Sequence, residues 1–152
     1  MKTNTLTEAI ALREVGQITK AINLLEVAIK QFPKDVELLT LMTHCYTLND
    51  QIDFAKIYLD KAKKWGAEHA LVGWNSARIL LKEKNTSEAL KVAKETFQRY
   101  PDDVEGMHVL GACLKENGKI TDSINILDRA IQLKPNYAEA LINRGLIKLS
   151  QG

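Results

Sequence analysis

The sequence predicts an all-α protein, an α-solenoid of nine helices arranged as repeated helical hairpins. Its 152 residues are 45% hydrophobic and 26% charged, which is the composition of an ordinary folded protein. Only 3 prolines and 8 glycines interrupt a chain in which helix-forming residues dominate. The third observation is an internal repeat, which points to the fold class more strongly than composition does.

Residues of the same kind recur every 34 positions along the chain, without insertion. Ala21, Ala55 and Ala89 keep this interval, and the next equivalent position holds Ser123. The residues expected to form the turns between helices keep it too, and they are Gly16, Asp50, Lys84, Gly118 and Gly152. One helical hairpin cannot bury its apolar face alone, so such repeats must stack on their neighbours.

The first two periods each divide into helix, turn and helix. Thr5 and Glu8 form the pattern of a capping box, so the first helix should run from there to Gly16. The second helix should end before Pro33, because proline cannot continue a helix. In the second period, apolar residues at helical spacing lie on both sides of a break at Asp50.

The later periods repeat these signals. Asn85 with Glu88 resembles a second capping box, and the helix that starts there should end before Pro101. Gly118 separates the helices of the fourth period, and Pro135 follows the second of them. The helices are therefore expected over residues 5–15, 18–31, 35–48, 52–64, 68–83, 86–99, 102–116, 120–132 and 136–149.

These repeats resemble those of tetratricopeptide repeat proteins, whose pattern places small residues at positions 8, 20 and 27 and large apolar residues at 4, 11 and 24. The repeat that starts at Val104 fits this pattern with Met107, Leu110, Gly111, Leu114, Ser123, Leu127, Ala130 and Pro135. The third repeat departs most, since Gly73 and Ser76 stand where bulk is expected. The resemblance implies a right-handed superhelix of four repeats, over residues 2–35, 36–69, 70–103 and 104–137.

The last segment, residues 138–152, is open to two interpretations: a capping helix, or the first helix of a fifth repeat. Arg144 and Lys148 stand at positions where the pattern has apolar residues, which favours a cap with one solvated face. Gly152, however, stands where a turn to a further helix would begin. The same observations leave open whether the chain is complete or a piece of a longer protein.

The charge balance argues against a main role in coating nucleic acid or an anionic membrane. Lysine and arginine number 21 against 19 aspartate and glutamate, a net charge of +2. The polar start contains no signal-peptide core, and no apolar stretch approaches the roughly 20 residues needed to span a bilayer. We therefore expect a cytoplasmic protein without a nucleic-acid or membrane partner.

No group of residues predicts catalysis, a metal site or a cofactor, so we do not expect an enzyme. Cys45 and Cys113 stand at equivalent positions two repeats apart, which should exceed the roughly 7 Å limit for a disulfide, so both thiols should be free. His44 and His108 have no acidic residue at ligand spacing.

The densest basic cluster consists of Lys61, Lys63 and Lys64. These side chains are expected to complement the C-terminal end of a helix dipole and to keep one helix face solvated. Aromatic interleaving of the kind used to stack bases is not expected there.

The resemblance implies a function in protein binding, with first helices lining a concave groove. Eight residues are the candidate contacts for a peptide or protein partner: His44, Trp74, Asn75, Arg78, Lys82, His108, Lys115 and Asn143. The clamp residues with which some family members bind chaperone tails are not in place, which argues against a co-chaperone. Two other functions stay open, the docking region of a larger transferase and a scaffold that self-associates through its terminal helices.

Trp74 has two possible orientations. On the groove it would lie beside Arg78, whose guanidinium could cover the indole, and it would be a partly exposed hot spot. Alternatively, it rotates inward and fills the space left by Gly73 and Ser76. We favour the groove orientation on the position that the repeat assigns to it.

Overall fold

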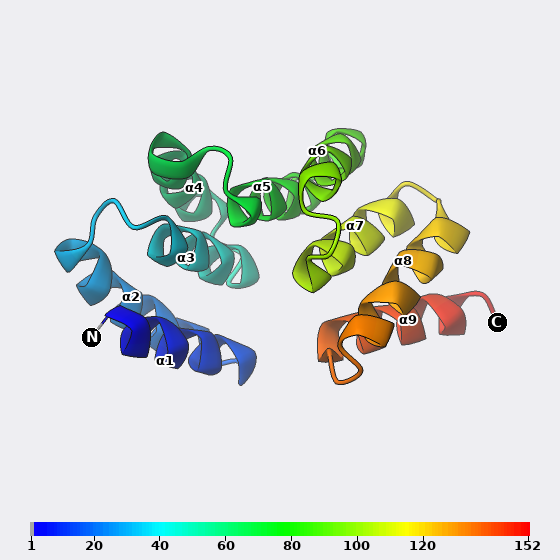
Figure 1. The fold of residues 1–152 in the computed structure, drawn as a ribbon, viewed down its shortest axis with the longest axis horizontal. Helices are drawn as coiled ribbons and strands as arrows, with labels where there is room; N and C mark the ends of the chain where they lie inside the picture. The colour runs from blue at the N-terminus through cyan, green and yellow to red at the C-terminus, as the bar shows by residue number, and fades with distance from the viewer. Residues whose placement is uncertain (1) are drawn as a thin grey trace. The chain divides into compact units, whose positions relative to one another are not determined.

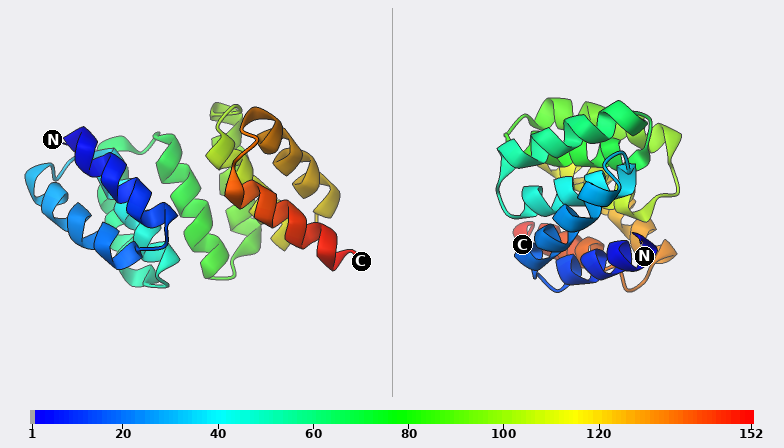
Figure 2. Two further views of the ribbon diagram at one scale, coloured as in Figure 1. Left: turned by 90° about the horizontal axis from the view of Figure 1, so that it is seen from below. Right: turned by 90° about the vertical axis from the view of Figure 1, so that its left-hand side faces the viewer.

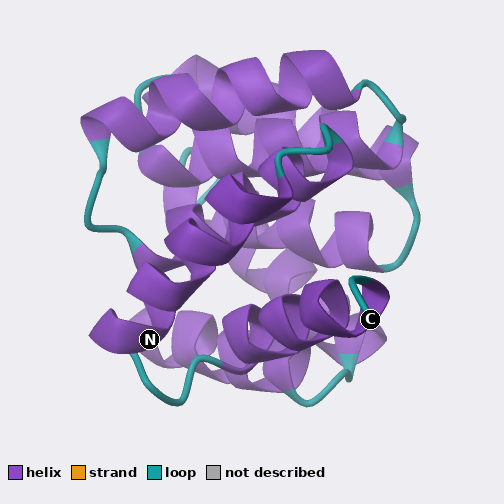
Figure 3. Ribbon diagram, turned by 90° about the vertical axis from the view of Figure 1, so that its right-hand side faces the viewer, coloured by secondary structure: helices purple, strands orange, loops and turns teal. Residues whose placement is uncertain are grey.

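The computed structural model describes residues 2–152, and within them it contains nine α-helices and no strand (Figures 1 and 3). This confirms the all-α helical-repeat class. The helices are α1 (Lys2–Glu14), α2 (Ile18–Gln31), α3 (Val36–Leu48), α4 (Ile52–Gly66), α5 (Ala70–Lys82), α6 (Thr86–Arg99), α7 (Val104–Glu116), α8 (Ile120–Leu133) and α9 (Ala138–Ser150). No helix among these residues is both long enough and apolar enough to cross a membrane.

The helix starts show which capping residues the sequence analysis placed correctly. Thr5 lies inside α1, which begins at Lys2, so the first capping box is wrong. Asn85 does precede α6, but its side chain makes no capping hydrogen bond. Aspartates cap two other helices instead: Asp35 Oδ1 accepts from the Leu38 amide at 3.0 Å, and Asp103 caps α7 in the same way. Each aspartate follows a proline by two residues, so α3 and α7 begin just after the expected starts.

The turn positions within each period are confirmed by the backbone. All five residues at the 34-residue interval have a positive φ: Gly16, Asp50, Lys84, Gly118 and Gly152. At Gly118, φ is +73°, and the next amide, that of Lys119, donates to the Leu114 carbonyl at 2.9 Å and closes α7. Asp50 and Lys84 adopt the same conformation at φ 55° and 64° despite their side chains. The repeat therefore fixes the turn even where glycine is absent.

The chain divides within α5 into two compact units, Met1–Asn75 and Ser76–Gly152. In unit 1, α1 packs on α2 and α3, α2 on α3, and α3 on α4. In unit 2, α7 packs on α6, α8 and α9, and α8 on α9. Consecutive helices of a hairpin run antiparallel and are joined by short loops (Figure 2).

Small residues lie where the helices of unit 2 approach one another most closely. A Cβ atom at Gly111 of α7 would lie 2.8 Å from Leu127 Cδ2 on α8. Ser123 is fully buried, and its Oγ donates to the Gly111 carbonyl at 2.6 Å. In unit 1, Ala55 and Ala62 of α4 are fully buried as well. The small residues at positions 8, 20 and 27 thus permit close helix packing, as the repeat pattern predicts.

The core of unit 2 combines large and small apolar residues of α7, α8 and α9. Met107, Leu127, Ala130, Ala140 and Ile147 form one buried cluster. Partly buried apolar side chains from α6 and α8 pack against it. This core holds α7 and α9 side by side, which positions the candidate site described next.

Candidate functional site

The eight predicted contact residues are divided between the two units. In unit 1, His44 lies half-buried on α3, and Arg13 Nη1 lies 3.1 Å from its Nδ1. Cys45, the next residue, is fully buried. The His44 imidazole and the Cys45 thiol therefore point to different sides of α3. The imidazole is thus oriented by a guanidinium donor, with Nδ1 as the acceptor.

The prediction that Trp74 and Asn75 are exposed contact residues is wrong. The Trp74 side chain is 0% exposed, and Asn75 is 1% exposed. The Asn75 amide Nδ2 donates to the Thr40 carbonyl at 2.9 Å, which ties α5 to α3. Because Gly73 and Ser76 bring little bulk to α5, the indole provides the buried apolar surface in their place. Of the two orientations considered above, the inward one is therefore correct.

In unit 2, Arg78 and Glu105 form an ion pair between α5 and α7. Arg78 Nη2 lies 2.8 Å from Glu105 Oε1, and the two side chains are only 14% and 30% exposed. A pair this sheltered is oriented more firmly than one at the open surface. Lys82, near the end of α5, is exposed.

Next to this ion pair, His108 of α7 is a titratable group with a strongly shifted pKa. Its Nδ1 is buried and has no hydrogen-bond partner among the described residues, and its ring meets the Tyr137 ring edge-on at 5.9 Å. Burial, together with the charges of Arg78 and Lys115, lowers the pKa of His108 from 6.5 to about 4. Glu139 and Glu105 oppose this shift only in part. His108 is therefore neutral at pH 7.

A loss of stability in acid follows from this pKa. Between pH 6.5 and 4 the unfolded chain binds a proton at His108 that the folded chain does not, so the free energy of unfolding falls as pH is lowered. Urea unfolding at several pH values should show that a His108→Gln variant loses less stability over this window than the wild type. An equal loss in both proteins would contradict the assignment.

Two further candidates join α7 to α9. Lys115 Nζ lies 3.5 Å from Asn143 Oδ1, and also 3.5 Å from Glu116 Oε1. Its side chain is 34% exposed, so the ammonium group remains accessible to a partner. The structure therefore brings His108, Lys115 and Asn143 together on neighbouring helices.

The eight predicted contact residues do not include an apolar row on α9. Ile142, Leu146 and Leu149 are 62%, 58% and 79% exposed, and their spacing places them on one side of the helix. We call the surface formed by His108, Lys115, Asn143, Ile142 and Leu146 the α7–α9 face. The helical spacing of the apolar row was visible in the sequence, but its exposure was not.

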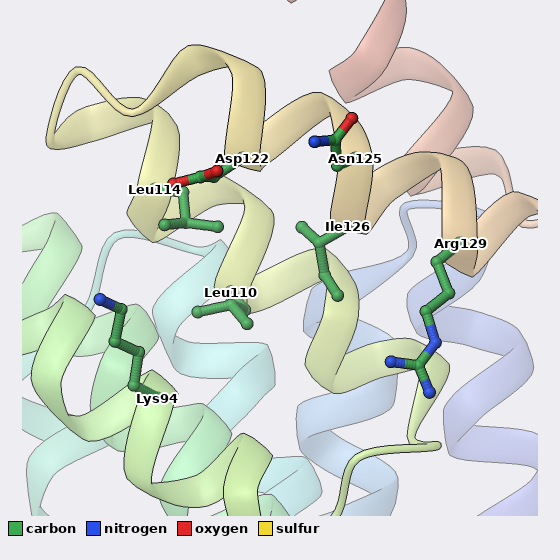
Figure 4. A pocket seen from close by; sticks show the side chains of 7 residues that line it. All are labelled: Lys94, Leu110, Leu114, Asp122, Asn125, Ile126 and Arg129. Carbon is green, nitrogen blue, oxygen red and sulfur yellow. The ribbon is translucent and has the colours of Figure 1, made fainter.

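A second feature of unit 2 escaped the sequence analysis. An open hollow of about 410 Å³ lies over α6, α7 and α8, with the buried Leu110 and Leu114 at its floor (Figure 4). Arg129 at its rim is paired with Asp102 at 3.1 Å. None of the eight predicted contact residues lines this hollow.

The lysine cluster on α4 also differs from expectation. Lys61 Nζ lies 4.6 Å from the centre of the Tyr58 ring, and Lys64 Nζ lies 5.3 Å from that of Trp65. Two of the three lysines therefore lie over aromatic rings, a contact that the sequence analysis did not predict. The helical spacing of Tyr58 and Trp65 was the signal that could have revealed them.

The described residues contain no group of three or more histidine, cysteine or acidic side chains arranged to hold a metal ion. Cys45 and Cys113 are free and buried, which confirms the prediction of free thiols. Burial raises the pKa of Cys45 to about 11 and that of Cys113 to about 12. Neither thiol is poised for nucleophilic chemistry.

Both thiols should therefore resist modification in the folded protein. At pH 8 they are protonated and covered, so a disulfide reagent such as Ellman's should react with neither until the chain unfolds. After denaturation without reductant, the same reagent should count 2 thiols per chain. Fast reaction of either cysteine in the native protein would be incompatible with the packing around it.

Comparison with protein families gives two matches. A model described as "Tetratricopeptide repeat" matches residues 12–73, and one described as "TPR repeat" matches residues 111–152. Together these matches cover more than half of the chain. No curated protein matches the sequence.

Solved structures give the same fold. A tetratricopeptide repeat protein from Parabacteroides merdae is 18% identical, with a TM-score of 0.80, over 99% of this chain and 59% of that one. PilF of Pseudomonas aeruginosa is 16% identical, with a TM-score of 0.71, over 99% of this chain and 68% of that one. YrrB, described as a TPR protein with an unusual peptide-binding site, is 18% identical, with a TM-score of 0.57, over 97% and 76%.

At these identities the solved structures establish the fold alone. The family to which the chain belongs is shown by the two family matches. Tetratricopeptide repeats are in general protein-interaction modules and non-catalytic scaffolds. The 34-residue interval, the positive-φ turns and the two family matches lead to one conclusion: this chain belongs to the tetratricopeptide repeat family.

Proposed function

We propose that this protein binds a segment of a partner protein and that the α7–α9 face of unit 2 is a contact surface for it. The observation that carries the proposal is the row of exposed apolar side chains on α9 beside an accessible lysine on α7. Such a surface suits a segment with two or three apolar side chains and an acceptor group for Lys115.

The chemistry around this face supports a protein ligand. Ile142 and Leu146 offer apolar area that water now covers, which gives a driving force for association. The neutral His108 belongs to the face, and the ion pair of Arg78 with Glu105 lies next to it. These groups can set the register of a bound backbone through hydrogen bonds. Lys82, exposed on α5, completes the proposed contacts of unit 2.

Unit 1 also contains a proposed contact residue for a partner. His44 of α3, held by Arg13, stands at a groove position of the second repeat, and we propose it as a contact residue there. Trp74 and Asn75 are not among the proposed contacts, because both are buried.

The test uses a partner captured from native extract, then purified and measured quantitatively. Ile142→Asp and Leu146→Asp should each weaken its binding by about 2 kcal/mol, the loss typical of an interface hot spot, in calorimetric titration. Leu133→Asp is the matched control, because Leu133 of α8 is also exposed, at 54%, and lies outside the face. Equal weakening by all three variants would reject the assigned surface.

The apolar row on α9 also suits a second copy of the chain, which is the competing function. Sedimentation equilibrium separates the two. We expect the protein without its partner to sediment as a monomer. A dimer that Ile142→Asp dissociates would instead assign this face to self-association.

A further inference from the structure

Helix α4 of unit 1 carries large apolar side chains on its outer side. Phe54, Ile57 and Trp65 are 51%, 49% and 43% exposed. Side chains of this size and apolarity are more often buried in a core. Phe54, Tyr58 and Trp65 recur at helical spacing, so they form one row along the helix. The buried residues of α4, Ala55, Leu59 and Ala62, lie on a different side.

Lysines lie over the rings of this row. Lys61 Nζ is 4.6 Å from the centre of Tyr58, and Trp65 has Lys34 Nζ at 4.6 Å and Lys64 Nζ at 5.3 Å. In the described part of the chain, no carboxylate forms an ion pair with these three lysines. Their ammonium groups are held in place by ring faces while their charges stay unneutralised.

The row is backed by a rigid support. Tyr46 of α3 is buried, and its ring stacks on Phe54 at 5.3 Å and on Tyr58 at 5.6 Å between centres. Burial, the neighbouring Tyr58 and the Glu26 carboxylate of α2 each raise the pKa of its hydroxyl. The stacked rings of α3 and α4 are therefore in place before any ligand arrives, which lowers the entropic cost of binding.

We propose that this surface, formed by Phe54, Tyr58, Lys61, Lys64, Trp65 and Lys34 and called the aromatic–lysine face, binds an acidic protein segment that carries an aromatic or aliphatic anchor. Carboxylates of such a segment would pair with the three unneutralised ammonium groups. Its anchor would cover Phe54 and the exposed part of Trp65. This surface goes beyond the α7–α9 face and belongs to the other unit.

The geometry favours an acidic peptide over nucleic acid. Base stacking needs a free ring face, and lysines already lie over the faces of Tyr58 and Trp65. Exposed carboxylates also lie on the same helix, at Asp53 and Asp60, and would repel a continuous phosphate backbone. A peptide can place its few charges opposite the lysines alone.

The experiment titrates the full chain with a synthetic peptide of Asp and Glu residues around one Phe. Trp65 is the reporter, because the other tryptophan, Trp74, is fully buried. We expect a saturable change in Trp65 fluorescence. Lys61→Glu and Lys64→Glu should each weaken the affinity about tenfold, and calorimetry should show a similar loss for Trp65→Ala.

Lys63→Glu is the matched control, with the same change of charge at an exposed lysine of α4 that contacts no ring of the row. Thermal unfolding of every variant checks that it is folded. Absence of peptide binding, or equal weakening by Lys63→Glu, would overturn the proposal. So would tighter binding of oligothymidylate or of phosphatidylserine vesicles that depends on Lys61 and Lys64. None of these results bears on the α7–α9 face, so the two proposals fail independently.

Discussion

Replacing Trp74 by alanine is expected to lower the free energy of unfolding by about 3–5 kcal/mol. Trp74 is the largest fully buried side chain among the residues that the structure describes. Its removal takes away the transfer energy of an indole and leaves a cavity that neighbouring side chains fill only in part. Urea unfolding followed by circular dichroism measures this loss.

Trp65→Ala is the control for this prediction, because it removes the same side chain from the surface. Trp65 is 43% exposed and leaves no internal cavity, so the expected loss is about 1 kcal/mol or less. If both variants unfold at the same urea concentration, Trp74 is not in the core. A Trp74→Phe variant should recover most of the stability, since it restores an aromatic ring to the site.

The case of Trp74 illustrates where the sequence pattern stops being informative. The repeat pattern predicts for each position whether its side chain faces the core or the surface. That prediction is correct for Ala62 and Leu127, which are both fully buried. It fails in the third repeat, because Gly73 and Ser76 cannot fill the volume that their positions normally occupy. The need for close packing then overrides position in the repeat.

The turns were predictable because the requirement there is local. The tight turn after the first helix of each repeat needs a residue with a positive φ, and the 34-residue interval identifies that residue without knowledge of packing. Asp50 and Lys84 would not be chosen by residue type alone. Their agreement with Gly16 and Gly118 comes from the interval.

The contacts of the candidate surfaces were less predictable because they join distant segments. Lys34 reaches Trp65 from a turn one repeat earlier, and no spacing rule within one helix relates them. Arg78 likewise pairs with Glu105 across two helices. The sequence indicated which residues lie on these helices, but the ion pair and the cation–π contacts required the fold.

The second large prediction concerns the packing of α7 on α8. The effect of Gly111→Ala on the free energy of unfolding should change sign when Leu127 is replaced by alanine. Leu127 is fully buried, so Leu127→Ala should cost about 2–5 kcal/mol. In the wild type, a Cβ atom at Gly111 would lie 2.8 Å from Leu127 Cδ2 and 2.9 Å from Cγ. Overpacking of this kind costs about 1–3 kcal/mol. It outweighs the gain of about 1 kcal/mol from replacing a helical glycine.

In the Leu127→Ala background those leucine atoms are gone, so only the helix gain remains. Gly111→Ala should then raise the free energy of unfolding by about 0.5–1 kcal/mol. Gly145→Ala is the matched control, since a Cβ atom on that helical glycine of α9 meets no atom within 4 Å. It should stabilise both backgrounds alike. A Gly111→Ala effect of the same sign and size with and without Leu127 would mean that α7 and α8 do not approach each other as closely as the structure places them.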